Sequence, residues 1–146
     1  MSTVGLESID HTVQLTNSWL KRLVDEHHFA DRHQAYNALR AVIQALRDQL
    51  TTEQALHLSA QFPILVRGIY VEGWHIDPDK KAAGNVEEFA LEVTRRLPSQ
   101  FSRDGKLTAE AVFDLLWKEL DPGLVAKLLD ELPAQLRSLW PATARR

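Results

Sequence analysis

The sequence contains no cysteine and no long apolar run. The absence of cysteine excludes a disulfide framework, thiolate chemistry and a cysteine-based zinc site. No stretch approaches the roughly 18 uninterrupted apolar residues that a membrane span needs. The first ten residues lack the basic and apolar regions of a secretory signal peptide. We therefore expect a cytoplasmic protein that does not insert into a membrane.

Neither sign of charge is in large excess, since 17 basic residues face 20 acidic ones and the formal net charge is -3. Nucleic-acid binding requires clustered positive charge, so no nucleic-acid partner is predicted. The six glycines are scattered and form no phosphate-binding loop. No nucleophile–base motif of known spacing occurs either. The sequence therefore predicts no enzyme and no cofactor.

What the chain does contain is an internal repeat. Residues 39–69 align with residues 109–139 without a gap, and seven of the 31 positions are identical. Self-similarity at a fixed offset predicts a tandem duplication of one structural unit. The identical pairs are Ala41 and Ala111, Val42 and Val112, Leu46 and Leu116, Leu50 and Leu120, Leu58 and Leu128, Pro63 and Pro133, and Arg67 and Arg137.

Apolar residues recur with helical spacing along most of the chain, and no period-two run predicts a strand. We expect helices over about 8–27, 31–50, 52–62, 64–71, 85–97, 108–120 and 121–132, followed by a further short helix after Pro133. The predicted N-caps are Asp31, Thr51 or Thr52, Asn85, Thr108 and Asp121.

These elements predict an all-α fold built from two units, each of roughly 70 residues. We assign 1–74 to the first helical repeat, 75–84 to an inter-repeat loop and 85–146 to the second repeat. Each unit alone would leave an apolar face uncovered, so we expect the two to pack around a shared core with pseudo-two-fold symmetry.

Arg67 and Arg137 occupy equivalent positions, four residues after a proline. Each guanidinium can bind neighbouring carbonyls or carboxylates and so tie the short terminal helix to the helix before it. The alternative is a paired anion site near the pseudo-symmetry axis.

Tyr70, Glu72 and Trp74 lie where the two repeats differ most, because nothing in the second copy matches Gly73-Trp74. Loops carry function more often than cores do, so we expect these three residues to contribute to a surface that contacts a partner. The rival interpretation makes Trp74 a core residue that fixes the crossover between repeats. We favour a mixture, with the indole packed on one face and exposed on the other.

Histidines and carboxylates cluster once, at Glu26, His27, His28, Asp31 and His33. Adjacent histidines project about 100° apart on a helix, and the i, i+4 spacing of zinc-binding helices is absent. We therefore predict no metal site.

The combination of residues 38–47, Thr52-Glu53-Gln54-Ala55, Gln61-Phe62-Pro63, Arg67-Gly68-Ile69-Tyr70 and Gly73-Trp74 resembles a family of bacterial helical proteins. The later Glu87-Glu88-Phe89 and Leu139-Trp140-Pro141 fit the same pattern. That family is known only as a domain of unknown function, so the resemblance implies a two-repeat helical fold and a bacterial origin but no catalytic residues.

The function that we expect is a non-enzymatic interaction, adaptor or regulatory module with a protein partner, and a homo-oligomer is a further possibility. The alternative is a protein that binds a small ligand or anion in the groove between the repeats. An exposed apolar patch would favour the first. A deep pocket reached by Arg67 or Arg137 would favour the second, and carboxylates with divergent pKa values would favour an enzyme.

Overall fold

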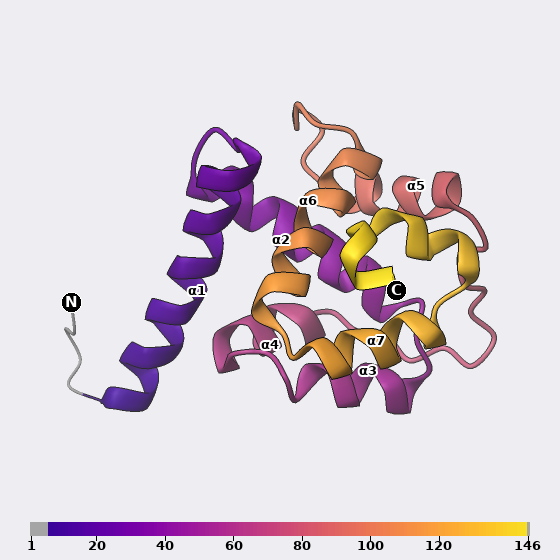
Figure 1. The fold of residues 1–146 in the computed structure, drawn as a ribbon, viewed down its shortest axis with the longest axis horizontal. Helices are drawn as coiled ribbons and strands as arrows, with labels where there is room; N and C mark the ends of the chain where they lie inside the picture. Colours follow the sequence, from indigo (N-terminus) through magenta and orange to yellow (C-terminus); the bar gives the residue numbers. More distant parts are fainter. Residues whose placement is uncertain (1–5, 146) are drawn as a thin grey trace.

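The computed structural model describes residues 6–145 and shows an all-α fold (Figure 1). No strand occurs among these residues, so the predicted fold class is confirmed. The elements are α1 (Glu7–His27), α2 (Arg32–Arg47), α3 (Thr52–Ser59), α4 (Ile64–Val71), α5 (Val86–Arg96), α6 (Gly105–Glu119) and α7 (Pro122–Glu131), then 3₁₀ segments at Ala134–Leu139 and Ala142–Arg145.

Side-chain caps explain where most of these helices begin. The carboxylates of Asp31 and Asp121 and the amide oxygen of Asn85 each accept a hydrogen bond from the backbone N–H three residues further on. Thr51 forms a reciprocal capping box with Gln54. These groups satisfy backbone donors that a helix start leaves unpaired. Four of the five predicted caps are therefore confirmed, with Thr51 rather than Thr52 in use.

The start of α6 differs from the prediction. Asp104, not Thr108, is the N-cap, and the helix begins at Gly105. Thr108 is fully buried in the first turn, where its hydroxyl donates to the Asp104 carbonyl over 2.7 Å. Gly105 lies in the first turn of α6 at a point where α5 passes close by, and a Cβ at this position would lie 2.2 Å from the carbonyl oxygen of Ala90. The glycine therefore permits close helix packing rather than forming a loop.

Helix α2 lies at the centre of the core. Ten of its residues are buried, and it packs against α1, α4, α5 and α6. Helices from both sides of the 75–84 loop therefore share one apolar interior. Aromatic rings reinforce it in two clusters, one formed by Trp19, Phe62 and Tyr70 and the other by Phe89, Phe113 and Trp140.

The repeat offset is visible in where elements begin and which residues are buried. Helices α3 and α7 begin at residues 52 and 122, and α4 and the first 3₁₀ segment begin at residues 64 and 134. Both members of each identical aliphatic pair are buried, as Leu46 (1% exposed) and Leu116 (0%) illustrate. The short element after Pro133 is a 3₁₀ segment, whereas its counterpart after Pro63 is an α-helix.

The first half of α1 stands at the edge of the molecule (Figure 1), and its first buried residue is Thr16. Sequence periodicity places Ile9 and Val13 on the inner face of this helix, but they are 48% and 41% exposed. The periodicity predicts which side of a helix is apolar and does not predict how far neighbouring helices extend along it. No helix among residues 6–145 is long and apolar enough to cross a membrane.

Candidate functional site

Arg67 and Arg137 make matching hydrogen bonds. The Nε of Arg67 donates to the carbonyl of Ser59 over 3.1 Å, and that of Arg137 donates to the equivalent carbonyl, of Leu129, over 2.8 Å. The Nη2 atoms donate to Phe62 and Leu132, which are again 70 residues apart, and Arg67 Nη2 also donates to the carbonyl of Ala60 over 3.5 Å. Each guanidinium thus binds the carbonyl end of the preceding helix, where backbone acceptors lack partners within the helix. This geometry matches the structural interpretation of the two arginines.

Tyr70 does not lie on the surface, so its assignment to a contact surface is wrong. The side chain is fully buried against Phe62, and its hydroxyl donates to the carbonyl of Ala55 over 3.0 Å. Burial raises the pKa of Tyr70 well above its ordinary value, so the phenol stays protonated and remains a donor. The helical register after Pro63 turns residues 66 and 70 inwards together.

Trp74 and Glu72 flank a buried arginine that sequence reasoning does not single out. The Nη1 of Arg47 donates to the carbonyl of Tyr70 over 2.9 Å, and Arg47 is only 3% exposed. Its guanidinium lies 5.8 Å from the Trp74 ring centroid, which is within cation–π range. The Trp74 side chain is half-buried, as the mixed interpretation expects, and Glu72 is exposed and paired with Arg40.

Arg47 also begins a charge network that links α2 to α5. Asp48 binds the Nε of Arg47 over 2.9 Å and forms an ion pair with Arg96. Beside this network lies an open hollow of about 560 Å³, which residues 80–83 of the loop line together with residues 48–49 and part of α5. Both signs of charge line the hollow, so it presents no selective field for an anion or a cation. The charged residues are Asp48, Lys80, Lys81, Glu88, Glu92 and Arg95.

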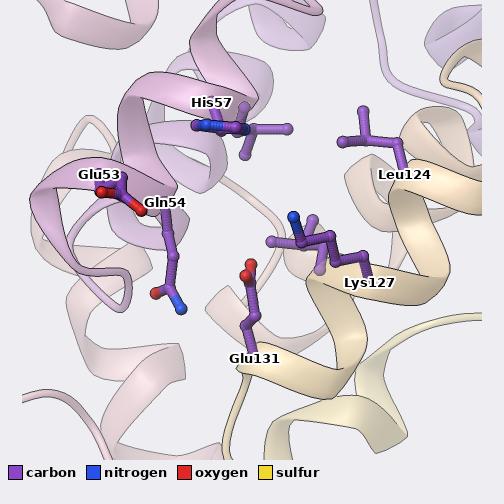
Figure 2. A pocket seen from close by; sticks show the side chains of 8 residues that line it. Glu53, Gln54, His57, Leu124, Lys127 and Glu131 are labelled. Carbon is purple, nitrogen blue, oxygen red and sulfur yellow. The ribbon is translucent and has the colours of Figure 1, made fainter.

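A small groove of about 70 Å³ lies between α3 and α7 (Figure 2). Leu58 and Leu128, which are equivalent positions in the offset alignment, form its buried floor. The polar groups around it carry both signs of charge, and neither Arg67 nor Arg137 is among the lining residues. Figure 2 shows the labelled side chains from both helices: Glu53, Gln54, His57, Leu124, Lys127 and Glu131.

A cluster of ionisable residues joins the end of α1 to α6. The ligand-type atoms of Glu26, His27 and Asp114 lie within 4.8 Å of one another. The Lys118 ammonium lies among them, 2.7 Å from Glu26 and 2.9 Å from Asp114, and His27 Nε2 lies 2.7 Å from Asp114. A cation would have to displace this ammonium, so the geometry is that of an ion-pair network. The prediction that the chain binds no metal stays a prediction.

The two pKa values that shift in this cluster move in the directions expected for the acidic and basic partners of a salt bridge. Burial opposes ionisation of Asp114, but hydrogen bonds from Lys118 and His27 outweigh it and hold the Asp114 pKa below its ordinary value. Hydrogen bonds to Glu26 and Asp114 raise the pKa of Lys118. Both shifts favour the charged forms, whereas a general acid or base needs a pKa near the working pH.

Among residues 6–145, five of the nine exposed large hydrophobic residues lie at the start of α1 and the start of α4, and we call these five residues the α1–α4 ridge. The two helices meet where the Thr12 hydroxyl of α1 accepts a hydrogen bond from the backbone N–H of Leu65 over 2.9 Å. The other four within the described part of the chain lie singly on α3, the 75–84 loop, α5 and α6. The ridge consists of Leu6 (59% exposed), Ile9 (48%), Val13 (41%), Ile64 (61%) and Leu65 (42%).

Comparison with known proteins gives a family without an assigned activity. A search of the curated proteins finds no significant match. The sequence pattern of the uncharacterized conserved proteins called DUF2267 matches residues 16–139, which include every helix from α2 to α7. The chain therefore belongs to the DUF2267 family, a domain of unknown function.

Proposed function

We propose that this protein is a non-enzymatic interaction module that binds a protein partner through the α1–α4 ridge, as an adaptor or a regulator. The observation that supports it is the set of five exposed apolar side chains on two helices that meet at the Thr12–Leu65 hydrogen bond, because exposed apolar side chains that gather on one face mark interaction sites. Ile9 and Ile64 leave about half or more of their side chains in water.

Neither competing function has comparable support. The α3–α7 groove has a volume of about 70 Å³, well below the roughly 300 Å³ at which small-molecule pockets begin, and the larger hollow of about 560 Å³ is open and lined by both signs of charge. The donors of Arg67 and Arg137 are directed at backbone carbonyls rather than at an open site. Asp114 and Lys118 have pKa shifts that stabilise an ion pair. An interaction module therefore fits the geometry better than a ligand binder or an enzyme.

The proposal is tested by affinity capture from cell extract with the wild-type chain and two variants. The ridge variant carries Ile9→Ser and Ile64→Ser, and the control carries Leu91→Ser and Leu107→Ser at leucines that are 59% and 53% exposed elsewhere. We expect the wild type and the control to recover the same proteins and the ridge variant to lose them. Equal recovery by all three proteins would contradict a docking role for the ridge.

A second candidate function is the binding of one small chemical group, about the size of a single side chain, in the α3–α7 groove. Its apolar floor of Leu58 and Leu128 and its rim of Lys127 and Glu131 suit a small group with one polar end. Screening small ligands by thermal shift, with Leu58→Trp as a variant that fills the floor, tests this candidate. Ligands that stabilise the wild type and Leu58→Trp equally would not occupy the groove.

We further propose that the chain arose by tandem duplication and that its halves are related by a pseudo-two-fold axis. The hydrogen bonds of Arg67 and Arg137 support this origin, since two of the three partners of Arg67, Ser59 and Phe62, have their offset equivalents, Leu129 and Leu132, as the partners of Arg137. The resemblance described above supports a bacterial source. The lack of cysteine and the slightly negative charge support a cytoplasmic location without a nucleic-acid partner.

A further inference from the structure

We propose that the groove between α3 and α7 takes the side chain of a lysine that a protein partner presents. The inference rests on the proposed function, an interaction module with a protein partner, and gives the groove an occupant of defined chemistry. The methylene stem of the lysine lies on the apolar floor of Leu58 and Leu128, and its ammonium meets the carboxylates of Glu53 and Glu131 on the rim.

The apolar floor arises because α3 and α7 turn corresponding faces towards the groove. Positions 51–60 and 121–130 have the same order of exposed, half-buried and buried residues. Leu58 and Leu128 are 2% and 3% exposed, and Leu124 is half-buried beside them. Three lining residues of α3 therefore have a lining residue of α7 exactly one repeat further on, in the pairs Gln54 and Leu124, His57 and Lys127, and Leu58 and Leu128. An unbranched methylene stem can cover this floor without burying a polar group.

The rim of the groove has an excess of negative charge, because two carboxylates, Glu53 and Glu131, stand against one ammonium, Lys127. Within residues 6–145 none of these three side chains has a hydrogen-bond or ion-pair partner. Figure 2 shows Glu131 and Lys127 directed from α7 towards α3. The carboxylates of both helices are thus available to a cation, whereas an anion would meet like charge on each side.

The larger hollow beside the 75–84 loop differs in this respect. Its acidic residues Asp48 and Glu92 are already paired with arginines. The free carboxylates of the α3–α7 groove are therefore the feature that selects a positively charged group there.

Lys127 lowers the affinity of the groove for a cation without closing it. Its side chain is exposed and carries the ammonium on a flexible four-carbon stem. Because this ammonium has no partner within the described residues, it can turn into water when another cation binds and loses no hydrogen bond. Removing its charge should therefore strengthen the binding of a lysine, an effect opposite to that of removing a carboxylate.

The size of the groove indicates a side chain carried by a larger molecule. A volume of about 70 Å³ holds about five to seven water-sized atoms, since one water needs roughly 10–15 Å³. The stem and nitrogen of a lysine match this size. A free molecule of so few atoms gains little binding free energy. A lysine on a protein partner instead adds this contact to others made elsewhere, so the two sets reinforce each other.

The test is an NMR titration of the full chain with lysine blocked at both backbone ends. We expect saturable shifts of the Leu58 and Leu128 methyl signals, with a dissociation constant on the order of 10 mM. Two matched ligands remove the charge, since blocked norleucine keeps the stem without the nitrogen and blocked Nε-acetyl-lysine keeps a neutral nitrogen. Each is expected to bind at least about threefold more weakly than lysine.

Three charge variants complete the test, and circular dichroism verifies the fold of each. Glu131→Gln should weaken the binding of blocked lysine about two- to fivefold, and Lys127→Gln should strengthen it by a similar factor. The control is Glu87→Gln on α5, at an exposed glutamate outside the groove, and should leave the affinity unchanged.

The opposite results overturn the inference. These are equal binding of lysine and norleucine, unchanged or tighter binding by Glu131→Gln, or no methyl shifts up to about 100 mM ligand. Free butylamine that binds tenfold more tightly than blocked lysine also overturns it, because the groove then excludes a lysine on a backbone. In each case the proposed function stands if capture from cell extract still depends on Ile9 and Ile64. If capture does not depend on them either, both are wrong.

Discussion

Replacing Arg67 and Arg137 by methionine tests whether these two arginines are structural. Methionine keeps the apolar stem of the side chain and removes the guanidinium. Both variants lose two equivalent hydrogen bonds from a charged donor, to Ser59 and Phe62 in one case and to Leu129 and Leu132 in the other, and Arg67→Met also loses a longer one of 3.5 Å to Ala60. Because the two sets of bonds match, the two substitutions should have matching effects.

The magnitude follows from the number and setting of these bonds. A hydrogen bond to a charged group contributes about 1.5–3 kcal/mol when buried. Both arginines are half-buried, so water can partly replace the lost donors. We therefore expect a loss of about 2 kcal/mol in the free energy of unfolding for each variant. For a chain of this size that loss lowers the melting temperature by about 4–8 °C.

Urea denaturation followed by circular dichroism measures the loss, and thermal melts with and without sulfate or phosphate separate the two interpretations of the arginines. In the structural interpretation these anions stabilise the wild type and both variants equally. If the guanidinium groups form an anion site, millimolar phosphate raises the melting temperature of the wild type alone. A loss below about 0.5 kcal/mol in both variants would refute the hydrogen-bonding argument.

Four further predictions concern the core, the crossover and the ion-pair cluster. Leu46→Ala and Leu116→Ala should each reduce the free energy of unfolding by about 2–5 kcal/mol in urea melts, since both side chains are buried. Trp74→Ala should cost less than the roughly 3–5 kcal/mol of a fully buried aromatic, because this side chain is only partly buried; an unchanged melt would leave it only a surface role. Gly105→Ala should lower the melting temperature more than either leucine variant, because the new Cβ would meet the backbone of α5 at 2.2 Å. At pH values above its unfolded-state pKa, the Asp114 carboxylate stabilises the fold, because folding lowers the pKa of this group. This contribution to stability disappears as the pH falls through the folded-state pKa. Asp114→Asn should therefore destabilise the protein at neutral pH, and stability measured down to about pH 3 should show the difference from wild type shrinking.

The elements that sequence reasoning predicts well depend on local chemistry. Asp31, Asn85 and Asp121 are capping residues that act on a backbone N–H three positions away, so a short window contains both partners. The start of α6 escapes prediction because the role of Gly105 depends on Ala90 in another helix. A glycine read alone indicates a loop, and only the distance to α5 identifies it as a packing residue.

The site residues are harder to predict because their roles depend on contacts across the chain. The place of Tyr70 beside a loop suggests a surface position, yet it is buried with its hydroxyl bonded to Ala55. Nothing in the sequence distinguishes Arg47, although its guanidinium binds the carbonyl of Tyr70. His27 and Asp114 are separated by 87 positions, so no local pattern could place them together.

The central position of α2 has a consequence for how the molecule unfolds. Since α2 packs against helices on both sides of the 75–84 loop, neither half can lose its structure without exposing the apolar face of the other. We therefore expect the free energies of the two halves to be coupled and the chain to melt as one cooperative unit rather than as two independent halves. The backbone amides of α2 then become accessible to solvent only when the whole molecule unfolds. We therefore expect them to exchange with deuterium more slowly than the other amides of the protein.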